Sequence, residues 1–200
     1  MSTPEGPSKL PGSGWRRLVS GKWRLPSLIV GTLLFGAGIL AVSAFSVTLA
    51  WTNTESFCIS CHEMEAFVYE EFLDTVHDRN SGGVRATCID CHVPVEFGPK
   101  LLKKIIASKD VYHHLIGTLD TREKFQARRL HMAETVWSYM KATDSRECRG
   151  CHVAEKMDFD AQNGRAARKH EQMATSGKTC IDCHKGVAHA LPDDYIDDSA

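Results

Sequence analysis

Four copies of one short motif constrain this chain more than any other feature. Each copy has two residues between a pair of cysteines and a histidine directly after the second cysteine. Such a C-x-x-C-H motif attaches a c-type haem, because the two thiols add to its vinyl groups and the histidine reaches its iron. The motif cysteines are Cys58, Cys61, Cys88, Cys91, Cys148, Cys151, Cys180 and Cys183. The sequence therefore predicts four covalently bound haem c groups.

Two other uses of paired cysteines compete with this interpretation. C-x-x-C pairs also build zinc sites, and cysteines outside the cytoplasm also form disulfides. Neither use requires a histidine directly after the second cysteine, and histidine makes up only 10 of the 200 residues. Its presence at that place in all four motifs favours haem attachment over zinc and over disulfides.

An uninterrupted apolar run from Leu28 to Trp51 predicts a membrane-spanning helix. The run contains no charged residue, and Trp23 and Trp51 stand at its two ends. As a helix it would be about 36 Å long, which is enough to cross a hydrocarbon core of about 30 Å. A cleaved signal peptide has a shorter apolar region of about 7–15 residues. An uncleaved anchor is therefore favoured over a signal peptide and over a buried core helix.

Charge around the apolar run predicts its orientation. Basic residues dominate the preceding segment, in which Lys9, Arg16, Arg17, Lys22 and Arg24 face one acid, Glu5. The positive-inside rule places such a segment in the cytoplasm. We expect a cytoplasmic basic tail over residues 1–24, a transmembrane anchor over 25–51 and a periplasmic tetrahaem cytochrome c domain over 52–200. The predicted location is a single pass through a bacterial inner membrane.

The haem domain is predicted to be helical. Residues 99–116 open with Gly-Pro and end before a glycine, and a second helix is expected from Thr121 to about Lys141. Asp120 and Glu123 fit a variant of the capping box at its start. Its inward stripe is predicted to be Phe125, Met132, Val136, Trp137 and Met140.

The predicted fold class is mainly α. It combines one N-terminal transmembrane helix with a compact helical or irregular multihaem domain that has little or no β structure, because no alternating strand pattern stands out. With about 37 residues for each haem, the domain needs the haems for much of its core.

An internal repeat singles out two further histidines as iron ligands, and the spacing after the last motif adds a third. Thr-Cys-Ile-Asp-Cys-His occurs at residues 87–92 and again at 179–184, and His77 and His170 precede the two copies at similar distances. Haem iron takes a ligand on each face, and the motif histidines His62, His92, His152 and His184 supply one face. His189 lies too close to the last motif to reach around its own haem, so it would serve a neighbour. His113, His114 and His131 have no repeat partner and are expected to be packed or solvated.

The first motif differs from the others. It continues as Cys61-His62-Glu63-Met64, which places a thioether within reach of the same iron. A methionine after a haem motif is more often a core residue, so spacing alone leaves His62 and Met64 as alternative ligands.

These features resemble the NapC/NirT/NrfH-type tetrahaem quinol dehydrogenase family. The resemblance rests on the anchor, the four motifs, the C-x-x-C-H-x-M variant and the ending C-I-D-C-H-K-G-V-A-H, and it covers about residues 25–190. Family members pass electrons from membrane quinol to periplasmic reductases. Some carry Val-Pro-His after the second motif, where this chain has Val93-Pro94-Val95, so any role of that histidine is absent or moved here.

The resemblance also implies roles for individual residues. It implies that Met64 rather than His62 binds the first iron, whose other face is open at the quinol pocket, and that Lys103 and Asp110 belong to that pocket. It assigns His189 to the second haem and His77 to the third. His170 would serve the fourth, although its place in the repeat also suits the first.

We therefore expect a quinol dehydrogenase of anaerobic respiration, with menaquinol or ubiquinol as substrate. Asp110 would accept a quinol proton, and Lys103, on the same helix face, would orient the quinol oxygen or tune that acid. The expected partners are a periplasmic reductase of nitrate, nitrite or a similar substrate, or its cytochrome subunit, and the lipid bilayer. A homo-oligomer is a further alternative that the sequence does not decide. The net charge of −1 gives no sign of nucleic-acid binding.

Two other functions remain as alternatives. A passive anchored shuttle would receive electrons from another protein and would have no open haem. A terminal reductase would act on a small oxyanion at an open haem, but the chain has no further catalytic motif.

Overall fold

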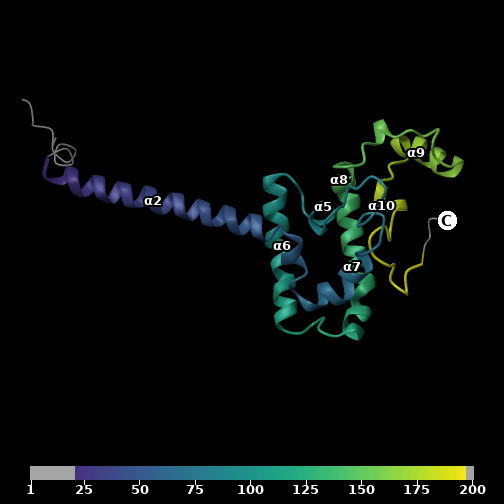
Figure 1. Ribbon diagram of the computed structural model, residues 1–200, viewed down its shortest axis with the longest axis horizontal. Coiled ribbons are helices and arrows are strands. Elements are labelled where there is room, and N and C mark those ends of the chain that lie inside the picture. Colours follow the sequence, from purple (N-terminus) through teal and green to yellow (C-terminus); the bar gives the residue numbers. More distant parts are fainter. Residues whose placement is uncertain (1–20, 197–200) are drawn as a thin grey trace, which may run out of the picture. The chain divides into compact units, whose positions relative to one another are not determined.

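The regular elements of the protein are helices. The computed structural model describes residues 21–196, and no β-strand occurs within that range (Figure 1). The chain divides into two compact units, Met1–Trp51 and Thr52–Ala200. The predicted mainly α fold class is confirmed for the part of the chain that the structure describes.

The first unit consists of the long helix α2, Gly21–Trp51. Its stretch from Leu25 to Trp51 has a mean hydropathy of 2.3 and is 0% buried. An apolar helix that is exposed on all sides is typical of a membrane span. Among the described residues this is the one helix long and apolar enough for that role. Residues 1–20 of the predicted basic tail lie outside the described residues.

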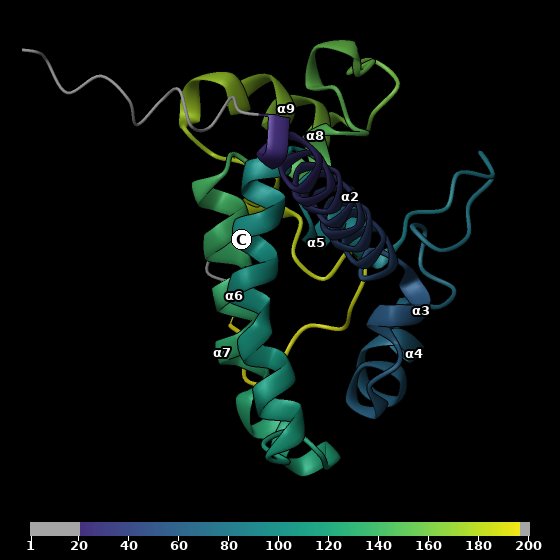
Figure 2. The same ribbon diagram turned by 90° about the vertical axis from the view of Figure 1, so that its left-hand side faces the viewer.

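Two long helices dominate the second unit. Helix α6 covers Phe97–Leu115 and α7 covers Arg122–Ala142. They run in opposite directions in Figure 1, and in the view of Figure 2 α6 passes in front of α7. The Lys103 ammonium group of α6 lies 4.2 Å from the ring centre of Tyr139 in α7. The two predicted helices are thus confirmed, with ends that differ by one or two residues.

The start of α7 corrects one prediction. Thr121, not Asp120, is the N-cap residue, and its hydroxyl accepts a hydrogen bond from the Lys124 amide at 3.3 Å. Thr121 has the extended backbone that a cap needs, with φ −121° and ψ 155°. The Asp120 carboxylate instead pairs with the Lys124 ammonium group at 2.6 Å.

The protein core of the second unit is small. Among the described residues, its buried side chains of the larger hydrophobic types are Phe67, Phe72, Phe125, Met140 and Ile181, beside the two buried prolines Pro94 and Pro192. The predicted inward stripe of α7 is confirmed, because Phe125 and Met140 are buried and its other three members are half-buried. These buried side chains are few for a unit of this size, so the polypeptide alone leaves its core incomplete.

Short helical segments carry the first cysteine of each motif. They are α3 (Glu55–Cys58), α5 (Cys88–His92), α8 (Arg146–Arg149) and α10 (Cys180–Cys183). Helices α5 and α10 begin with the same capping box, made by Thr87 with Asp90 and by Thr179 with Asp182. The sequence repeat is therefore also a structural repeat.

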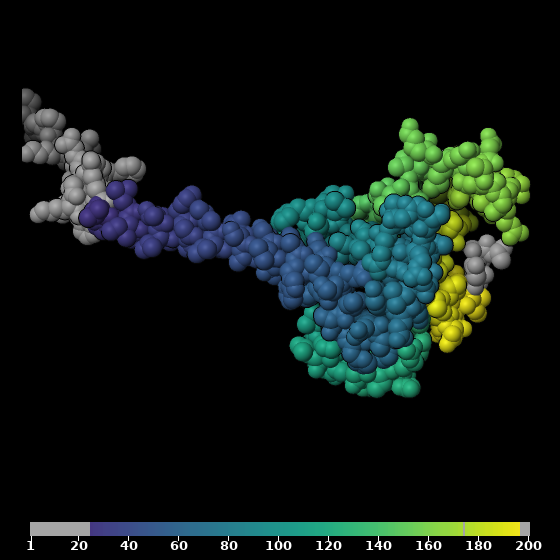
Figure 3. Space-filling model, in the orientation of Figure 1, coloured from purple at the N-terminus to yellow at the C-terminus, as the bar shows by residue number. Residues whose placement is uncertain are grey.

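The remaining elements connect these segments. A π-helix, η1, covers Met64–Tyr69 and continues into α4, Glu70–Phe72. A 3₁₀ turn, η2, covers Ala154–Lys156, and α9 covers Gly164–Ser176. In the space-filling view of Figure 3, the blue segment with the first two motifs lies across the visible face of the second unit.

Candidate haem sites

In space, each haem motif lies next to the motif that follows it in the sequence. All eight thiols are free, and none forms a disulfide in the described structure. Cys58 and Cys88 are in hydrogen-bonding contact, which lowers the pKa of Cys58 to about 7. Burial raises the pKa of Cys91 to about 11, and the neighbouring Cys148 adds to this rise. Burial also raises the pKa of Cys148, with a contribution from Cys180. The first motif thus adjoins the second, the second adjoins the third, and the third adjoins the fourth.

Three pairs of histidine rings lie at similar centre-to-centre separations. The ring centres are 6.3 Å apart for His92 and His189, 6.2 Å for His77 and His152, and 5.9 Å for His170 and His184. Two imidazoles that bind opposite faces of one iron, each through a nitrogen about 2 Å from the metal, have ring centres roughly 6 Å apart. Each pair joins one motif histidine to one of the three histidines predicted as further ligands. The spacing therefore fits a haem iron between the two rings.

Burial favours the neutral form of three of these rings, His92, His184 and His189. Burial lowers the pKa of His92 to about 4, and the charges of His189 and Lys103 act in the same direction. Burial likewise lowers the pKa values of His184 and His189. A neutral imidazole is the form that binds a metal, so burial prepares these side chains for ligation.

Hydrogen bonds orient two of the rings. His77 Nδ1 lies 3.3 Å from the Val187 carbonyl oxygen, and His170 Nδ1 lies 2.5 Å from Gln162 Oε1. When Nδ1–H donates to such an oxygen, Nε2 is left as the nitrogen that can bind iron. His189 is buried deeply enough that its pKa is lowered, although a hydrogen bond with the Val68 backbone acts in the opposite direction.

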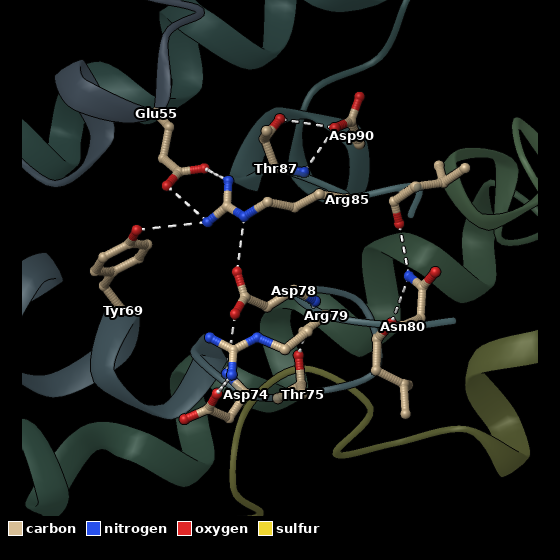
Figure 4. A network of polar contacts seen from close by, with 12 residues as sticks. Glu55, Tyr69, Asp74, Thr75, Asp78, Arg79, Asn80, Arg85, Thr87 and Asp90 are labelled. Atoms are coloured by element: carbon tan, nitrogen blue, oxygen red, sulfur yellow. Dashed lines mark hydrogen bonds and ion pairs between the residues drawn. The ribbon is translucent and has the colours of Figure 1, made fainter. Parts of the chain in front are cut away.

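An ion network holds the loop that carries His77. Arg85 donates to both carboxylate oxygens of Glu55 at 2.6 and 3.0 Å and to Asp78 Oδ1 at 2.7 Å (Figure 4). The Arg85 guanidinium group is the main reason that the pKa of Glu55 is lowered. Asp78 directly follows His77 in the chain, and Glu55 begins α3, which ends at Cys58. Arg85 thus ties the His77 loop to the first motif.

The first motif lacks a histidine pair of this kind among the described residues. His62 Nε2 lies 2.9 Å from the Asp120 carbonyl oxygen, so this nitrogen already has a partner. Met64 stands at the start of η1, and its side chain is 39% exposed. π-helical turns are frequently found at functional sites. Of the two alternatives, Met64 is the one whose donor atom no described residue engages in a hydrogen bond.

Comparisons with known proteins agree with this geometry. A family model described as the NapC/NirT cytochrome c family, N-terminal region, matches residues 21–194. The chain belongs to this family. The resemblance seen in the motifs is therefore confirmed, and the chain is an electron-transfer protein with covalently bound haem c. The thiols, the paired rings and the incomplete core fit that cofactor.

Individual relatives support the same conclusion. The cytochrome c-type protein NapC of Escherichia coli K12 is 53% identical over 175 residues, which cover 86% of this chain and 88% of the relative. The denitrification system component NirT of Stutzerimonas stutzeri is 51% identical over 166 residues, covering 83% and 81%. The cytochrome c-type protein TorY of Escherichia coli O157:H7 is 43% identical over 174 residues, but these are 86% of this chain and only 46% of TorY. No solved structure matches the chain.

Beside the first motif of this NapC/NirT family member lies a polar pair that the sequence did not predict. His114 Nδ1 lies 2.9 and 2.8 Å from the two carboxylate oxygens of Glu63, which is 6% exposed. Donor atoms of Cys61, Glu63 and His114 all lie within 4.8 Å of one another. Burial would raise the pKa of Glu63, but a backbone hydrogen bond and His114 lower it overall. In the sequence, only the position of Glu63 between His62 and Met64, the two candidate ligands of the first iron, points to a role for it.

The two predicted quinol-pocket residues lie in different surroundings on α6. Lys103 faces Tyr139 and contributes to the lowered pKa of His92, so its ammonium group is directed toward the second motif. Asp110 is exposed. Lys104, which was not singled out, donates a hydrogen bond to the Thr52 carbonyl, and its charge contributes to the lowered pKa of Cys58. The lysine beside the first motif is therefore Lys104.

Proposed function

We propose that this protein oxidises membrane quinol and delivers the electrons to a periplasmic reductase or to that reductase's cytochrome subunit. The observation that carries the proposal is the contrast between the motifs. Three motif histidines face a second histidine at 5.9–6.3 Å, whereas His62 does not. Three closed iron sites suit electron transfer, and one open site suits contact with a substrate.

We assign four haems to this chain, with the second held by His92 and His189, the third by His152 and His77, and the fourth by His184 and His170. Met64 is assigned to the first iron, because His62 Nε2 is engaged with a backbone carbonyl. When bound, each haem supplies a one-electron redox centre. The chain's own contribution is to hold neutral ligands in place and to bring the four motifs next to one another.

The quinol site is proposed to lie beside the first motif. His114 is one helical turn after Asp110 on α6, and it pairs with Glu63, which adjoins the first motif. Residues four apart share a helix face, so Asp110 stands on the face of α6 that is directed to the first motif. We propose that Asp110 accepts a quinol proton. Because the ammonium group of Lys103 faces Tyr139, its proposed role is to tune Asp110 rather than to orient the quinol oxygen.

The proposed location is the bacterial inner membrane. Helix α2 would anchor the protein with its N-terminus in the cytoplasm and residues 52–200 in the periplasm, as the basic residues before it favour. Cys58 follows Trp51 by seven residues, so the first haem would lie close to the membrane surface. Relatives named NapC and NirT support a reductase of nitrate, nitrite or a similar substrate as the partner.

The decisive experiment is quinol-dependent haem reduction. The full-length protein would be placed in lipid nanodiscs without any partner protein, and menaquinol and ubiquinol analogues would be added separately. We expect haem reduction by at least one of them at a rate that saturates with quinol concentration. A passive shuttle would show no reduction by either quinol, while dithionite still reduced every haem.

A further inference from the structure

The chain segment that contains His189 is irregular. No helix or strand occurs between Cys183, where α10 ends, and Ile196, the last described residue. Backbone hydrogen bonds of a regular element therefore do not place His189. Its position opposite His92 has to come from contacts made by other parts of the chain.

One buried ion pair makes such contacts. Arg129 of α7 is 9% exposed, and its two terminal nitrogens donate to the two carboxylate oxygens of Glu71 in α4 at 2.6 and 2.5 Å. This bidentate arrangement fixes the relative orientation of both side chains more firmly than a single contact would. Glu71 and Arg129 come from elements that are 58 residues apart in the sequence.

The same pair grips the backbone of the residue next to His189. Arg129 Nη2 donates to the Ala190 carbonyl oxygen at 2.7 Å, and the Ala190 amide donates to Glu71 Oε2 at 3.0 Å. Both polar backbone groups of Ala190 are therefore satisfied by one ion pair. We call this set, Glu71 with Arg129 and the Ala190 backbone, the Ala190 clamp.

The clamp has the properties needed to place a neighbouring ligand. Its two charged groups compensate each other, so it adds little net charge beside His189. Arg129 also lies 5.7 Å from the ring centre of Phe125, a buried core residue, which anchors the guanidinium group to the core of α7. A rigid pair attached to the core can hold an irregular segment in one position.

We propose that Glu71 and Arg129 are positioning residues that hold His189 opposite His92 and thereby keep the second haem six-coordinate. This inference rests on the proposed assignment of His189 to that haem. It predicts that loss of the clamp releases the His189 segment while the haem stays attached through Cys88 and Cys91.

The test uses full-length, haem-loaded protein and Arg129→Met, which keeps the volume but removes all three hydrogen bonds. We expect one additional high-spin haem per chain in the electron paramagnetic resonance spectrum, with an unchanged number of attached haems. Added imidazole should return that haem to the low-spin state, because an external ligand replaces the displaced one. General loss of structure would not be reversed by imidazole. Arg128→Met is the matched control, since Arg128 is the exposed neighbour on α7, and its spectrum should equal that of the wild type.

Two further variants distinguish a wrong positioning role for Glu71 and Arg129 from a wrong assignment of His189 to the second haem. His189→Ala should itself produce one imidazole-reversible high-spin haem. If it does and Arg129→Met leaves the spectrum unchanged, the positioning role is refuted while the ligand assignment stands. If His189→Ala leaves every low-spin haem in place, the assignment is wrong and the inference falls with it. Glu71→Met, which removes both acceptor oxygens, serves if Arg129→Met does not accumulate, and an unchanged spin state in Glu71→Met would equally refute the clamp.

Discussion

Replacing Asp110 by Asn tests the proposed quinol chemistry most directly. A quinol loses protons as it loses electrons, and an ionised carboxylate can accept one of them whereas an amide cannot. A positioned general base contributes about 10²–10⁴ in rate. We therefore expect quinol oxidation by Asp110→Asn to slow by at least about 100-fold.

The structure indicates that this loss would not be an effect on folding. Asp110 is exposed on α6, and an exposed substitution away from caps and buried networks usually changes stability by no more than about 0.5 kcal/mol. Asn also keeps the size of Asp. Haem attachment and the unfolding midpoint should therefore stay at their wild-type values.

The assay is stopped-flow haem reduction by a quinol analogue in nanodiscs. Dithionite reduction of the same samples measures the transfer of electrons among the haems independently of quinol. Glu134→Gln is the control, because Glu134 is an exposed carboxylate of α7 that lines a cavity with Asp182 of the fourth motif. Equal quinol-oxidation rates in the wild type and Asp110→Asn would remove Asp110 from the mechanism and leave it a solvated helix residue.

Further predictions concern the haems, the ligands, the topology and the cap. The intact mass of mature protein should correspond to four attached haems, and a smaller number in cells with full maturation capacity would contradict the correspondence of one motif to one haem. His77→Ala and His170→Ala should each convert one low-spin haem to high-spin, as measured by electron paramagnetic resonance; unchanged spectra would contradict the pairing with His152 and His184. A reporter active only outside the cytoplasm should work when fused after Ala200, whereas activity of a cytoplasm-only reporter there would reverse the proposed orientation. Thr121→Ala should destabilise the haem domain by about 0.5–2 kcal/mol, and denaturation should show a smaller effect for Asp120→Ala; the reverse order would contradict the cap assignment.

Features that depend on local chemistry were predictable from the sequence. The thiol spacing needed for a haem, the apolar length needed for a membrane span and the glycine that ends α6 all act within a few residues. The repeat also identified His77 and His170 as members of equivalent units. The N-cap residue of α7 was the local feature that the sequence predicted wrongly. Asp120 and Thr121 are both good capping residues, and the backbone of the preceding turn decided between them.

The tertiary structure alone decided which residues meet across long sequence distances. Nothing in the sequence placed His114 against Glu63, 51 residues earlier. The Ala190 clamp spans 119 residues between Glu71 and Ala190 and depends on three separate segments. Sequence patterns report the period of one segment, whereas these contacts depend on how helices pack once the chain has folded. The sequence by itself therefore predicted the number and kind of sites, and the packing of α4, α6 and α7 decided which distant side chains lie next to one another.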